Sequence, residues 1–380
     1  MRSEFIEPRD PPLSISINPI FNNIQVFTGN NEQHILYELL VTNGTKDPVR
    51  FLAIKISGFT CKHKNLFKHI MSAQDLTNNF SKISTANSTL PEDPVLQPNE
   101  TGIIYILLNF ECKVPNFLRH YVIVQTEGDP STIQSIILDP IKLNKTQPII
   151  ITPPLKGNKW YAANAIDNFT AHRRTIFILN GQIKIPERTA VDFVKYGPKG
   201  LYDGDPLINS SYYSYGKTIY SPCAGKVIGV MDGIIDNIPT MPMKDPVTSK
   251  NIGGNYVLIK IDDEHYAFLT HMIPKSLRVK IGDEVQIGQK LGLVGNSGQS
   301  ELAHLHFHIS NTPNIIGDYK EPSPINAQGV PFVFDKFILN EYIARGTSIF
   351  GPILPENVRV VDKNCVENQI LMNNDLVNFR

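Results

Sequence analysis

The chain has 380 residues, of which 41% are hydrophobic and 19% charged, a composition typical of a globular protein with two or three domains. Its 36 basic and 36 acidic residues give a formal net charge of zero, which argues against a general electrostatic grip on nucleic acid or on an anionic membrane. No stretch approaches the ~18 consecutive apolar residues of a membrane-spanning helix.

The N-terminal region predicts an accessory domain without a catalytic site. Residues 1–12 have no apolar signal core, and we expect them to be disordered or to be a cloning remnant left where a signal peptide was removed. Residues 13–150 show short apolar runs, such as 37–41 and 103–108, separated by turn signals such as Asn43-Gly44. This pattern is typical of an immunoglobulin-like β-sandwich. Its histidines are scattered, so we expect them on the surface or in the core: His34, His63, His69 and His120.

The four cysteines do not predict a metal site. Cys61, Cys112, Cys223 and Cys365 show no C-x-x-C spacing, which argues against a zinc–thiolate centre. Cys61 and Cys112 fall in one predicted domain, where they either form a disulfide in an oxidising compartment or remain free thiols. The sequence leaves both alternatives open.

The region 155–340 also predicts strands and tight turns, with little helical periodicity. Residues 256–261 and 265–271 predict a hairpin, and the glycines between 282 and 295 suit the corners or bulges of a β-barrel or an open antiparallel sheet. Residues 341–380 predict a largely irregular tail, with a possible strand at 358–361, that packs back onto this second domain. The whole chain is therefore expected to be mainly β.

The segment from His304 to Ser310 predicts a strand with three histidines on one face. Successive side chains on a strand point to opposite faces, so His304, His306 and His308 share a face. Imidazoles two residues apart on a rigid strand converge on one point, and neutral imidazole is a common zinc ligand. Because an isolated H-x-H also occurs on half-buried strands without a metal, the surrounding motifs must decide between the two interpretations.

Further motifs accompany this strand in a fixed order. They are an A-x-x-G-x-V-like strand at 222–228, G-N-x-V at 254–257, an x-Y-x-H-L-like strand at 268–272, a glycine-spaced stretch at 279–295, and S-G-x-S followed by H-L-H-F at 296–307. As an ordered set, these motifs resemble the lysostaphin/LytM-type zinc metallopeptidases, which cut peptide cross-bridges in bacterial cell walls. The resemblance implies a LytM-like domain over residues 155–340.

The resemblance also implies one zinc ion per chain and a role for each matching residue. His306 would be a zinc ligand, while His271 and His304 would be catalytic groups that orient water, move protons or stabilise the tetrahedral intermediate. The family takes its other two ligands from an H-x-x-x-D motif. Arg188 and Asp192 occupy these positions here. Asp192 fits as a ligand, but a protonated guanidinium has no lone pair to donate.

His172 is the nearest upstream replacement for the missing histidine. Asn180-Gly181 predicts a two-residue hairpin turn, and continuing the strand pairing backwards from that turn places His172 opposite Thr189. A strict register would put His172 and Asp192 on opposite faces, so a bulge near Pro186 is needed to correct the parity.

A divergent branch of the family is similar in this region, with H-R-R … R-x-A-x-D in place of H-x-x-x-D, and this chain keeps that pattern. We therefore expect His172, Asp192 and His306 to be the metal ligands. The alternative is a structural His172 beside a two-ligand, weakly metallated site.

Three other residues are predicted to lie near the site. His308 points the same way as His306 and is expected to form a hydrogen bond close to the metal. Arg188 either binds a carboxylate of a peptide substrate or forms a structural salt bridge. Tyr215 either lines a substrate groove or packs in the core.

The sequence thus predicts a zinc endopeptidase that hydrolyses peptide cross-links or stem peptides of bacterial peptidoglycan, in the periplasm or secreted. The alternative is a catalytically impaired relative that binds cell-wall peptide or regulates another hydrolase, as the Arg188 substitution suggests. A lipoyl- or biotinyl-like carrier domain also has glycine-spaced strands, but it needs a lysine at a hairpin tip and has no use for three histidines on one strand. No nucleic-acid partner is expected, and the sequence does not predict the oligomeric state.

Overall fold

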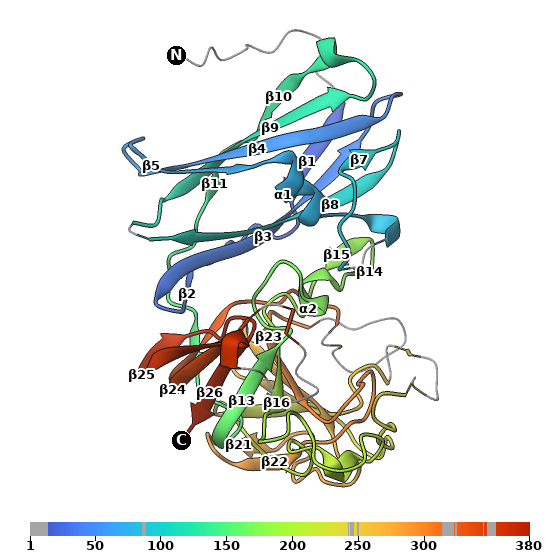
Figure 1. Cartoon of the computed structure of the whole chain (residues 1–380), viewed down its shortest axis with the longest axis vertical. Helices are drawn as coiled ribbons and strands as arrows, with labels where there is room; N and C mark the ends of the chain where they lie inside the picture. Colours follow the sequence, from blue (N-terminus) through green and yellow to red (C-terminus); the bar gives the residue numbers. More distant parts are fainter. Residues whose placement is uncertain are drawn as a thin grey trace. The chain divides into compact units, whose positions relative to one another are not determined.

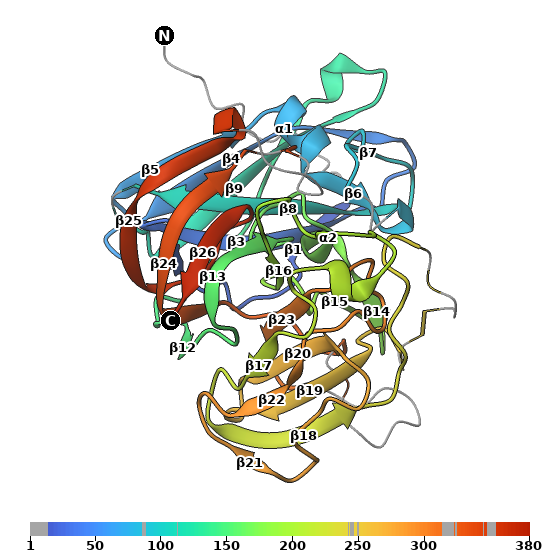
Figure 2. The same cartoon turned by 60° about the horizontal axis from the view of Figure 1, so that its bottom comes forward.

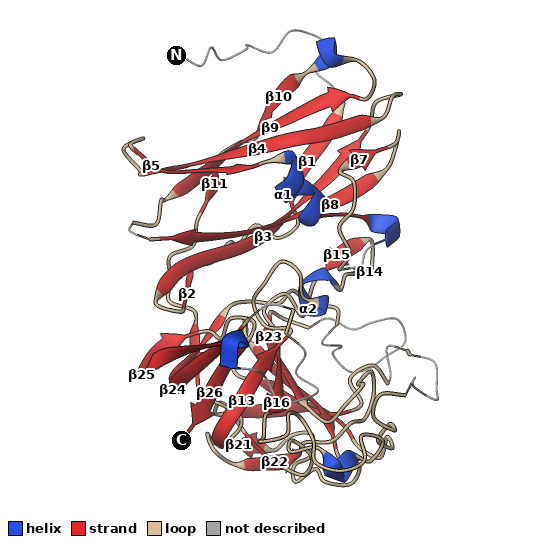
Figure 3. Ribbon diagram, viewed as in Figure 1, coloured by secondary structure: helices blue, strands red, loops and turns tan. Residues whose placement is uncertain are grey.

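The computed structural model of the chain is mainly β, as predicted (Figures 1 and 3). It describes residues 14–85, 89–111, 113–241, 243, 247–248, 251–313, 323, 325–344, 346–347 and 355–380. The chain divides into two compact units, one made of residues 1–27 and 32–147 and the other of residues 28–31 and 148–380. The predicted disordered segment 1–12 lies outside the described residues.

The first unit is a sandwich of two antiparallel sheets. One sheet has the order β1-β3-β8-β6 with β2 beside β3, and the other has the order β10-β9-β4-β5 with β11 beside β9 and β7 beside β4. The strands are β1 (Ile15–Pro19), β2 (Phe27–Gly29), β3 (Glu32–Asn43), β4 (Val49–Phe59), β5 (Asn65–Met71), β6 (Phe80–Lys82), β7 (Val95–Leu96), β8 (Thr101–Phe110), β9 (Phe117–Thr126), β10 (Gln134–Ile137) and β11 (Ile141–Lys142).

Strand alternation builds the core of this unit. Every second residue of β3, from Ile35 to Val41, is buried between the sheets together with alternate residues of β8 and β9. His120 of β9 lies in this core, where its Nε2 is 2.6 Å from the hydroxyl of Tyr37. Among the described cysteines, Cys61 and Cys365 are exposed and Cys223 is buried, all as free thiols, while Cys112 lies outside the described residues.

The second unit is built on one sheet of eleven strands, in the order β12-β24-β26-β13-β16-β23-β20-β19-β18-β21 with β25 beside β24 (Figure 2). Its strands are β12 (Ile149–Ile151), β13 (Gly157–Ala163), β16 (Val191–Lys195), β18 (Gly225–Met231), β19 (Asn255–Lys260), β20 (Tyr266–Met272), β21 (Glu284–Val285), β23 (Leu305–Ser310), β24 (Phe332–Ile343), β25 (Val358–Gln369) and β26 (Asp375–Phe379). All the neighbours pair antiparallel except β12 and β24, which are parallel.

The remaining elements are short. Two two-stranded sheets lie outside the large sheet: the hairpin of β14 (Phe177–Leu179) and β15 (Gln182–Lys184), and the pair of β17 (Thr218–Tyr220) and β22 (Lys290–Leu293). The helical segments are α1 (Ala73–Asn78), α2 (Ala171–Arg174), η1 (Ile83–Thr85), η2 (Pro130–Thr132), η3 (Asn209–Ser211) and η4 (Pro355–Asn357). Within the described part of the chain, no helix is long and apolar enough to span a membrane.

Two local expectations are wrong. The hairpin around Asn180-Gly181 has the predicted register, with Leu179 opposite Gln182, but it does not continue back to His172 because residues 171–174 form the helical turn α2. The predicted irregular tail instead forms strands, since β25 pairs with β24, and β26 pairs with both β24 and β13.

Aromatic side chains pack on one face of the sheet, opposite the face that carries Asp192 and His306. Phe193 of β16, Phe307 of β23 and Phe334 of β24 are all fully buried, and the Phe307 and Phe334 ring centroids lie 6.5 Å apart. Because side chains alternate along a strand, Asp192 and His306 must then face the opposite side. The aromatic layer thereby stiffens the two strands that carry these polar residues.

Candidate metal centre and catalytic histidines

The sheet register brings Asp192 and His306 together. β23 lies between β16 and β20, and His306 is directly opposite Asp192 on one side and Thr270 on the other. Directly opposite residues of an antiparallel pair share a face, so the carboxylate and the imidazole meet without help from a loop. Asp192 Oδ1 lies 3.0 Å from His306 Nδ1.

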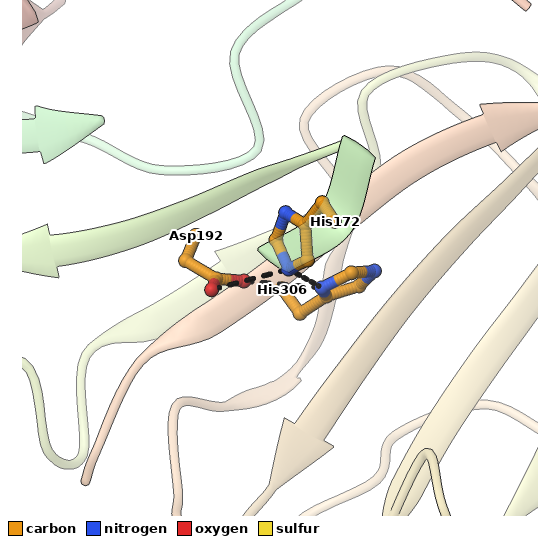
Figure 4. A group of neighbouring side chains, drawn as sticks. All are labelled: His172, Asp192 and His306. Carbon is orange, nitrogen blue, oxygen red and sulfur yellow. Dashed lines mark hydrogen bonds and ion pairs between the residues drawn. The ribbon is translucent and has the colours of Figure 1, made fainter. Parts of the chain in front are cut away.

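His172 reaches the same point from the helical turn α2 rather than from a strand. Thr170 caps this turn, and its side chain accepts a hydrogen bond from the backbone of Arg173. His172 Nδ1 donates to the carbonyl oxygen of Asn164 at 2.9 Å, which leaves Nε2 pointing at Asp192 and His306 (Figure 4). The Asn164 side chain also donates to Asp192 Oδ2 at 3.0 Å, so Asn164 orients two of the three groups.

The three side chains form a compact, buried set of potential metal ligands. His172 Nε2 is 3.1 Å from His306 Nδ1 and 3.2 Å from Asp192 Oδ2, and one ligand atom from each of the three residues lies within 4.8 Å of the others. At bond lengths of ~2.0–2.2 Å, ligand atoms around a tetrahedral zinc ion are about 3.3–3.6 Å apart. The observed spacing is close to that value, so these residues fit a zinc ion.

Charge within this set is strongly coupled. Burial alone would raise the pKa of Asp192, but the neighbouring imidazoles of His172 and His304 hold it well below its usual range. Burial alone would lower the pKa of His172, but the Asp192 carboxylate outweighs it and raises the pKa to about 9. A cation between the ligand atoms would take the place of the proton that this arrangement otherwise holds.

His271 and His304 lie beside the three candidate ligands. Their ring centroids are 4.7 Å apart, and His304 Nε2 is 3.4 Å from Asp192 Oδ1. His271 Nδ1 donates to the carbonyl oxygen of Ser297 at 2.7 Å, and His304 Nδ1 donates to that of Leu302 at 2.8 Å. Each imidazole is thus fixed through Nδ1 and presents Nε2 to the site.

The two histidines have opposite electrostatic environments. Burial, and then the neighbouring His304 and His306, lower the pKa of His271 well below its ordinary value. Burial also acts to lower the pKa of His304, but Asp192 outweighs it and raises the pKa. His271 is therefore neutral at neutral pH, whereas the pKa of His304 is shifted in the opposite direction. Such a split between two adjacent groups is typical of an acid–base pair.

His271 also has an unusual backbone. Its φ angle is +63°, in the left-handed region that is uncommon for residues other than glycine. Its backbone N–H donates to Gly253 at 3.2 Å, and its carbonyl oxygen accepts from Gly295 at 2.9 Å. Strained residues held by their surroundings in this way concentrate at functional sites.

The structure places the other predicted residues in different ways. His308 Nδ1 is 2.9 Å from His306 Nε2. His308 therefore contacts one of the three candidate ligands but is not itself one of them. Arg188 is buried and donates to Gln328 Oε1 at 3.0 Å, and burial lowers its pKa to about 9. The Tyr215 hydroxyl donates to Asp236 at 2.8 Å, and its ring packs against a buried cluster that includes Tyr212.

Sequence reasoning missed two residues of this site. Asn164 orients His172 and Asp192, as described above, and Glu187 Oε1 lies 3.9 Å from His306 Nε2. Glu187 directly precedes Arg188, which occupies the position of the family's ligand histidine. The sequence could therefore have indicated Glu187 as a residue near the site. Asn164 offered no such signal, because it lies eight residues before His172 in a segment without a motif.

The family model described as Peptidase family M23 matches residues 211–316 of this chain. The matched residues contain His271, His304 and His306. This part of the chain is therefore similar to peptidase family M23. The predicted resemblance to lysostaphin/LytM-type peptidases is therefore confirmed, while His172 and Asp192 lie before the matched residues.

One curated relative covers much more of the chain than the M23 match. An uncharacterized metalloprotease of Buchnera aphidicola subsp. Baizongia pistaciae (strain Bp) is 22% identical over 317 residues, which cover 81% of this chain and 75% of the relative. The similarity thus extends beyond the M23 domain into the rest of the chain.

Solved structures of M23 proteins also match. A mutant catalytic domain of the prophage-encoded M23 protein EnpA from Enterococcus faecalis is 21% identical, over 47% of this chain and 92% of that one, with a TM-score of 0.24. The catalytic domain of the antimicrobial peptidase lysostaphin from Staphylococcus simulans is 20% identical, over 46% and 88%, with a TM-score of 0.22. A zinc-containing peptidase from Vibrio cholerae is 14% identical, over 73% and 78%, with a TM-score of 0.26. Scores this low add nothing to the fold described above.

Proposed function

We propose that this chain is a zinc-dependent endopeptidase that hydrolyses peptide bonds of bacterial peptidoglycan, with His172, Asp192 and His306 as the metal ligands and His271 and His304 as the catalytic histidines. The convergence of the three ligand atoms carries the proposal. In both histidine ligands, the ring nitrogen that faces away from the cluster already has a hydrogen-bond partner, which fixes the other nitrogen for the metal.

When bound by these residues, zinc supplies a water molecule that is acidic enough to ionise near neutral pH and a positive charge beside the scissile carbonyl. The chain's own histidines then move the protons. His271 holds its own proton on Nδ1 towards Ser297, so its Nε2 lone pair accepts the proton of the attacking water. His304 is held by Leu302 through Nδ1, and Asp192 raises its pKa, so in its protonated form Nε2 donates a hydrogen bond to the oxygen on which negative charge develops.

The choice of substrate is supported by the match of residues 211–316 to peptidase family M23 and by the ordered motifs that resemble lysostaphin/LytM-type peptidases. We therefore propose peptidoglycan peptides as the substrate, and the periplasm or the cell exterior as the place of action, because peptidoglycan lies outside the cytoplasm.

A second candidate function is a catalytically impaired relative that binds wall peptide or regulates another hydrolase. The observation that favours it is Arg188, which stands at the position of a family ligand and is buried against Gln328. The first proposal requires His172 to replace that ligand, and the second does not. Metal content and hydrolysis therefore separate the two.

The deciding experiment incubates purified peptidoglycan with the zinc-loaded chain and identifies the released peptides by mass spectrometry. New peptide termini that appear with wild type and not with His306→Ala support the peptidase. His265→Ala is the matched control, because His265 lies in the β19–β20 turn and pairs with Asp262 at 2.9 Å, away from the site histidines. Stoichiometric zinc binding without any cleavage, or the absence of both, would favour the impaired relative.

A further inference from the structure

The two catalytic histidines depend on one loop. Residues 295–303, here called the histidine loop, run from the end of the glycine-spaced stretch to the start of β23. Ser297 in this loop accepts the hydrogen bond of His271, and Leu302 accepts that of His304. The Ser300 hydroxyl lies 3.2 Å from His304 Nδ1. Any shift of the histidine loop would therefore change the relative positions of both imidazoles.

A second segment holds the histidine loop in place. Residues 232–240, here called the strap, follow β18 and form a β-bridge between Asp236 and Ser297. Asp236 Oδ1 accepts from the backbone of Asn296 at 2.9 Å. At the far end of the strap, the backbone of Thr240 donates to Glu301 at 2.7 Å. The strap thus contacts the histidine loop near both of its ends.

Asn237 makes the densest set of these contacts. Its side-chain amide donates to the carbonyl oxygens of Gly298 at 2.7 Å and Ser300 at 2.9 Å, and its backbone N–H donates to Asn296 at 2.9 Å. One side chain therefore fixes the loop between Ser297, which holds His271, and Ser300, which contacts His304. No other side chain in the described part of the strap donates to two carbonyl oxygens of the histidine loop.

The strap is itself held from the side away from the histidine loop. Asn209 donates to the carbonyl oxygen of Asn237 at 2.7 Å, and Tyr215 donates to Asp236 at 2.8 Å. Tyr215 was predicted either to line a substrate groove or to pack in the core. Its hydroxyl helps to hold the strap through Asp236. The strap has fixed points on both sides.

The candidate metal ligands have a different scaffold. His172, Asp192 and His306 belong to α2, β16 and β23, and the hydrogen bonds described for their side chains come from Asn164, from His308 and from one another. None of these bonds involves the strap. The ligand set and the catalytic pair meet where His304 Nε2 lies 3.4 Å from Asp192 Oδ1, but the strap holds only the histidine loop, so a change in the strap acts first on the catalytic pair.

We propose that Asn237 is a positioning residue for the reaction, which pins the histidine loop so that His271 and His304 keep their spacing and orientation without affecting metal binding. This inference rests on the proposed function. Misplacement of reacting groups by about 1 Å can lower a rate by ~100-fold. Loss of the two amide hydrogen bonds is therefore expected to lower kcat by about 10- to 100-fold, with little change in KM or in zinc affinity.

The test compares Asn237→Ala, Asn237→Asp and the control Ile238→Ser in the full chain loaded with zinc. Asn237→Asp keeps the size of the side chain but replaces the amide donor by oxygens, which repel the two carbonyl groups. Ile238 lies on the same strap with 59% of its surface exposed, so its replacement should leave the rate unchanged. Thermal melting and zinc content identify any variant that fails to fold.

The expected result is a 10- to 100-fold fall in kcat for both Asn237 variants, with KM and zinc affinity within about twofold of wild type. An unchanged kcat in a wild type that cleaves peptidoglycan would overturn the inference and leave the proposed function intact. Parallel loss of zinc would also overturn it, since the effect would then not be confined to the catalytic pair.

If wild type proves inactive, the proposed function fails, and imidazole NMR spectra still test the inference. In Asn237→Ala, the resonances of His271 and His304 are expected to shift while those of His172 and His306 stay in place. Equal shifts in all four, or none, would contradict it.

Discussion

Both units of this chain bury histidines, with opposite consequences. In the first unit, His120 packs inside the sandwich beside the Tyr37 hydroxyl, and burial lowers its pKa to about 4. In the second unit, burial acts on His172 in the same direction, but Asp192 reverses the outcome and raises the pKa to about 9. A buried imidazole with a neutral partner is a structural element, whereas a buried imidazole with a carboxylate becomes part of a charged site.

Geometry makes the same distinction. The described histidines of the first unit lie on separate elements and do not converge, while five from the second unit come together within one face of the sheet: His172, His271, His304, His306 and His308. β23 supplies His306 and His308, His304 directly precedes that strand, and β20 supplies His271. Convergence of histidines on a carboxylate, rather than the number of histidines, therefore distinguishes the unit that carries the candidate site.

The largest effect is expected when the negative charge of the Asp192 carboxylate is removed. Asp192→Asn keeps the shape of the side chain but removes the charge that joins His172, His304 and His306. We expect the loss of stoichiometric zinc and a fall of about 1,000-fold or more in peptidoglycan hydrolysis. Elemental analysis and a cleavage assay provide the measurements, with His265→Ala as the unaffected control. Retention of zinc in Asp192→Asn would remove this carboxylate from the ligand set.

A second buried carboxylate in the same unit has no such partners and should behave differently. Burial raises the pKa of Asp375 to about 8, although its Oδ2 accepts from the Met372 backbone at 2.9 Å. Because the folded chain then binds a proton that the unfolded chain releases, stability falls as pH rises from about 4 to about 8.

Asp375→Asn should therefore remove this pH dependence. We expect the variant to resemble wild type near pH 4 and to be more stable by an amount on the order of a few kcal/mol at pH 8 and above. Chemical denaturation at several pH values measures this. A variant that is less stable than wild type at pH 8 would show that the Asp375 carboxylate is favourably ionised in the fold.

His308 tests the contact next to the ligands. Its Nδ1 faces His306 Nε2 at 2.9 Å, and with a metal on His306 Nδ1 it would accept the hydrogen bond that Nε2 then donates. His308→Phe should weaken zinc binding by about 10- to 100-fold, and His308→Gln, which retains an acceptor, should weaken it less. Competition with a chromophoric chelator measures the affinity. Equal affinities for wild type and His308→Phe would show that His306 needs no such partner.

His120, the buried histidine of the first unit, is expected to affect stability but not metal binding. His120→Phe removes the hydrogen bond to Tyr37 and should cost about 1–2 kcal/mol of unfolding free energy. Zinc content and hydrolysis should not change, because His120 belongs to the sandwich core. Loss of zinc from a folded His120→Phe chain would contradict the division of roles between the units.

The smallest expected effect concerns the backbone of His271. At its φ of +63°, glycine is favoured over alanine, so His271→Gly should be more stable than His271→Ala by about 1 kcal/mol, the reverse of the usual order. Both variants should lose hydrolysis, since neither retains the imidazole. Thermal or urea unfolding of the pair measures the difference, and a more stable alanine variant would show that the left-handed conformation does not persist without the side chain.

Much of the site follows from strand alternation, which the sequence makes visible. H-x-H-x-H on a strand required the three imidazoles to share a face, and the register of β23 with β16 then placed Asp192 opposite His306. The approach of His172 could not be predicted in the same way. Extending the hairpin register assumed a strand, whereas Thr170 caps a helical turn that redirects the chain.

Contacts that depend on distant segments were beyond sequence reasoning. Asn237 and Ser300 meet only because the strap crosses the histidine loop, and they are 63 residues apart. The tail 341–380 was expected to be largely irregular, yet β25 pairs with β24, and β26 pairs with both β24 and β13 in the main sheet. Local pattern predicts which face a side chain takes, while tertiary pairing decides which segments meet.

The most direct test of the account is a crystal structure of the zinc-loaded chain with anomalous diffraction measured at the zinc absorption edge. The account predicts one strong anomalous peak per chain, at about 2.0–2.2 Å from His172 Nε2, an Asp192 oxygen and His306 Nδ1. A peak that lacks His172 among its ligands, or that lies elsewhere in the chain, would contradict the claim that a histidine from a helical turn replaces the ligand that Arg188 cannot provide.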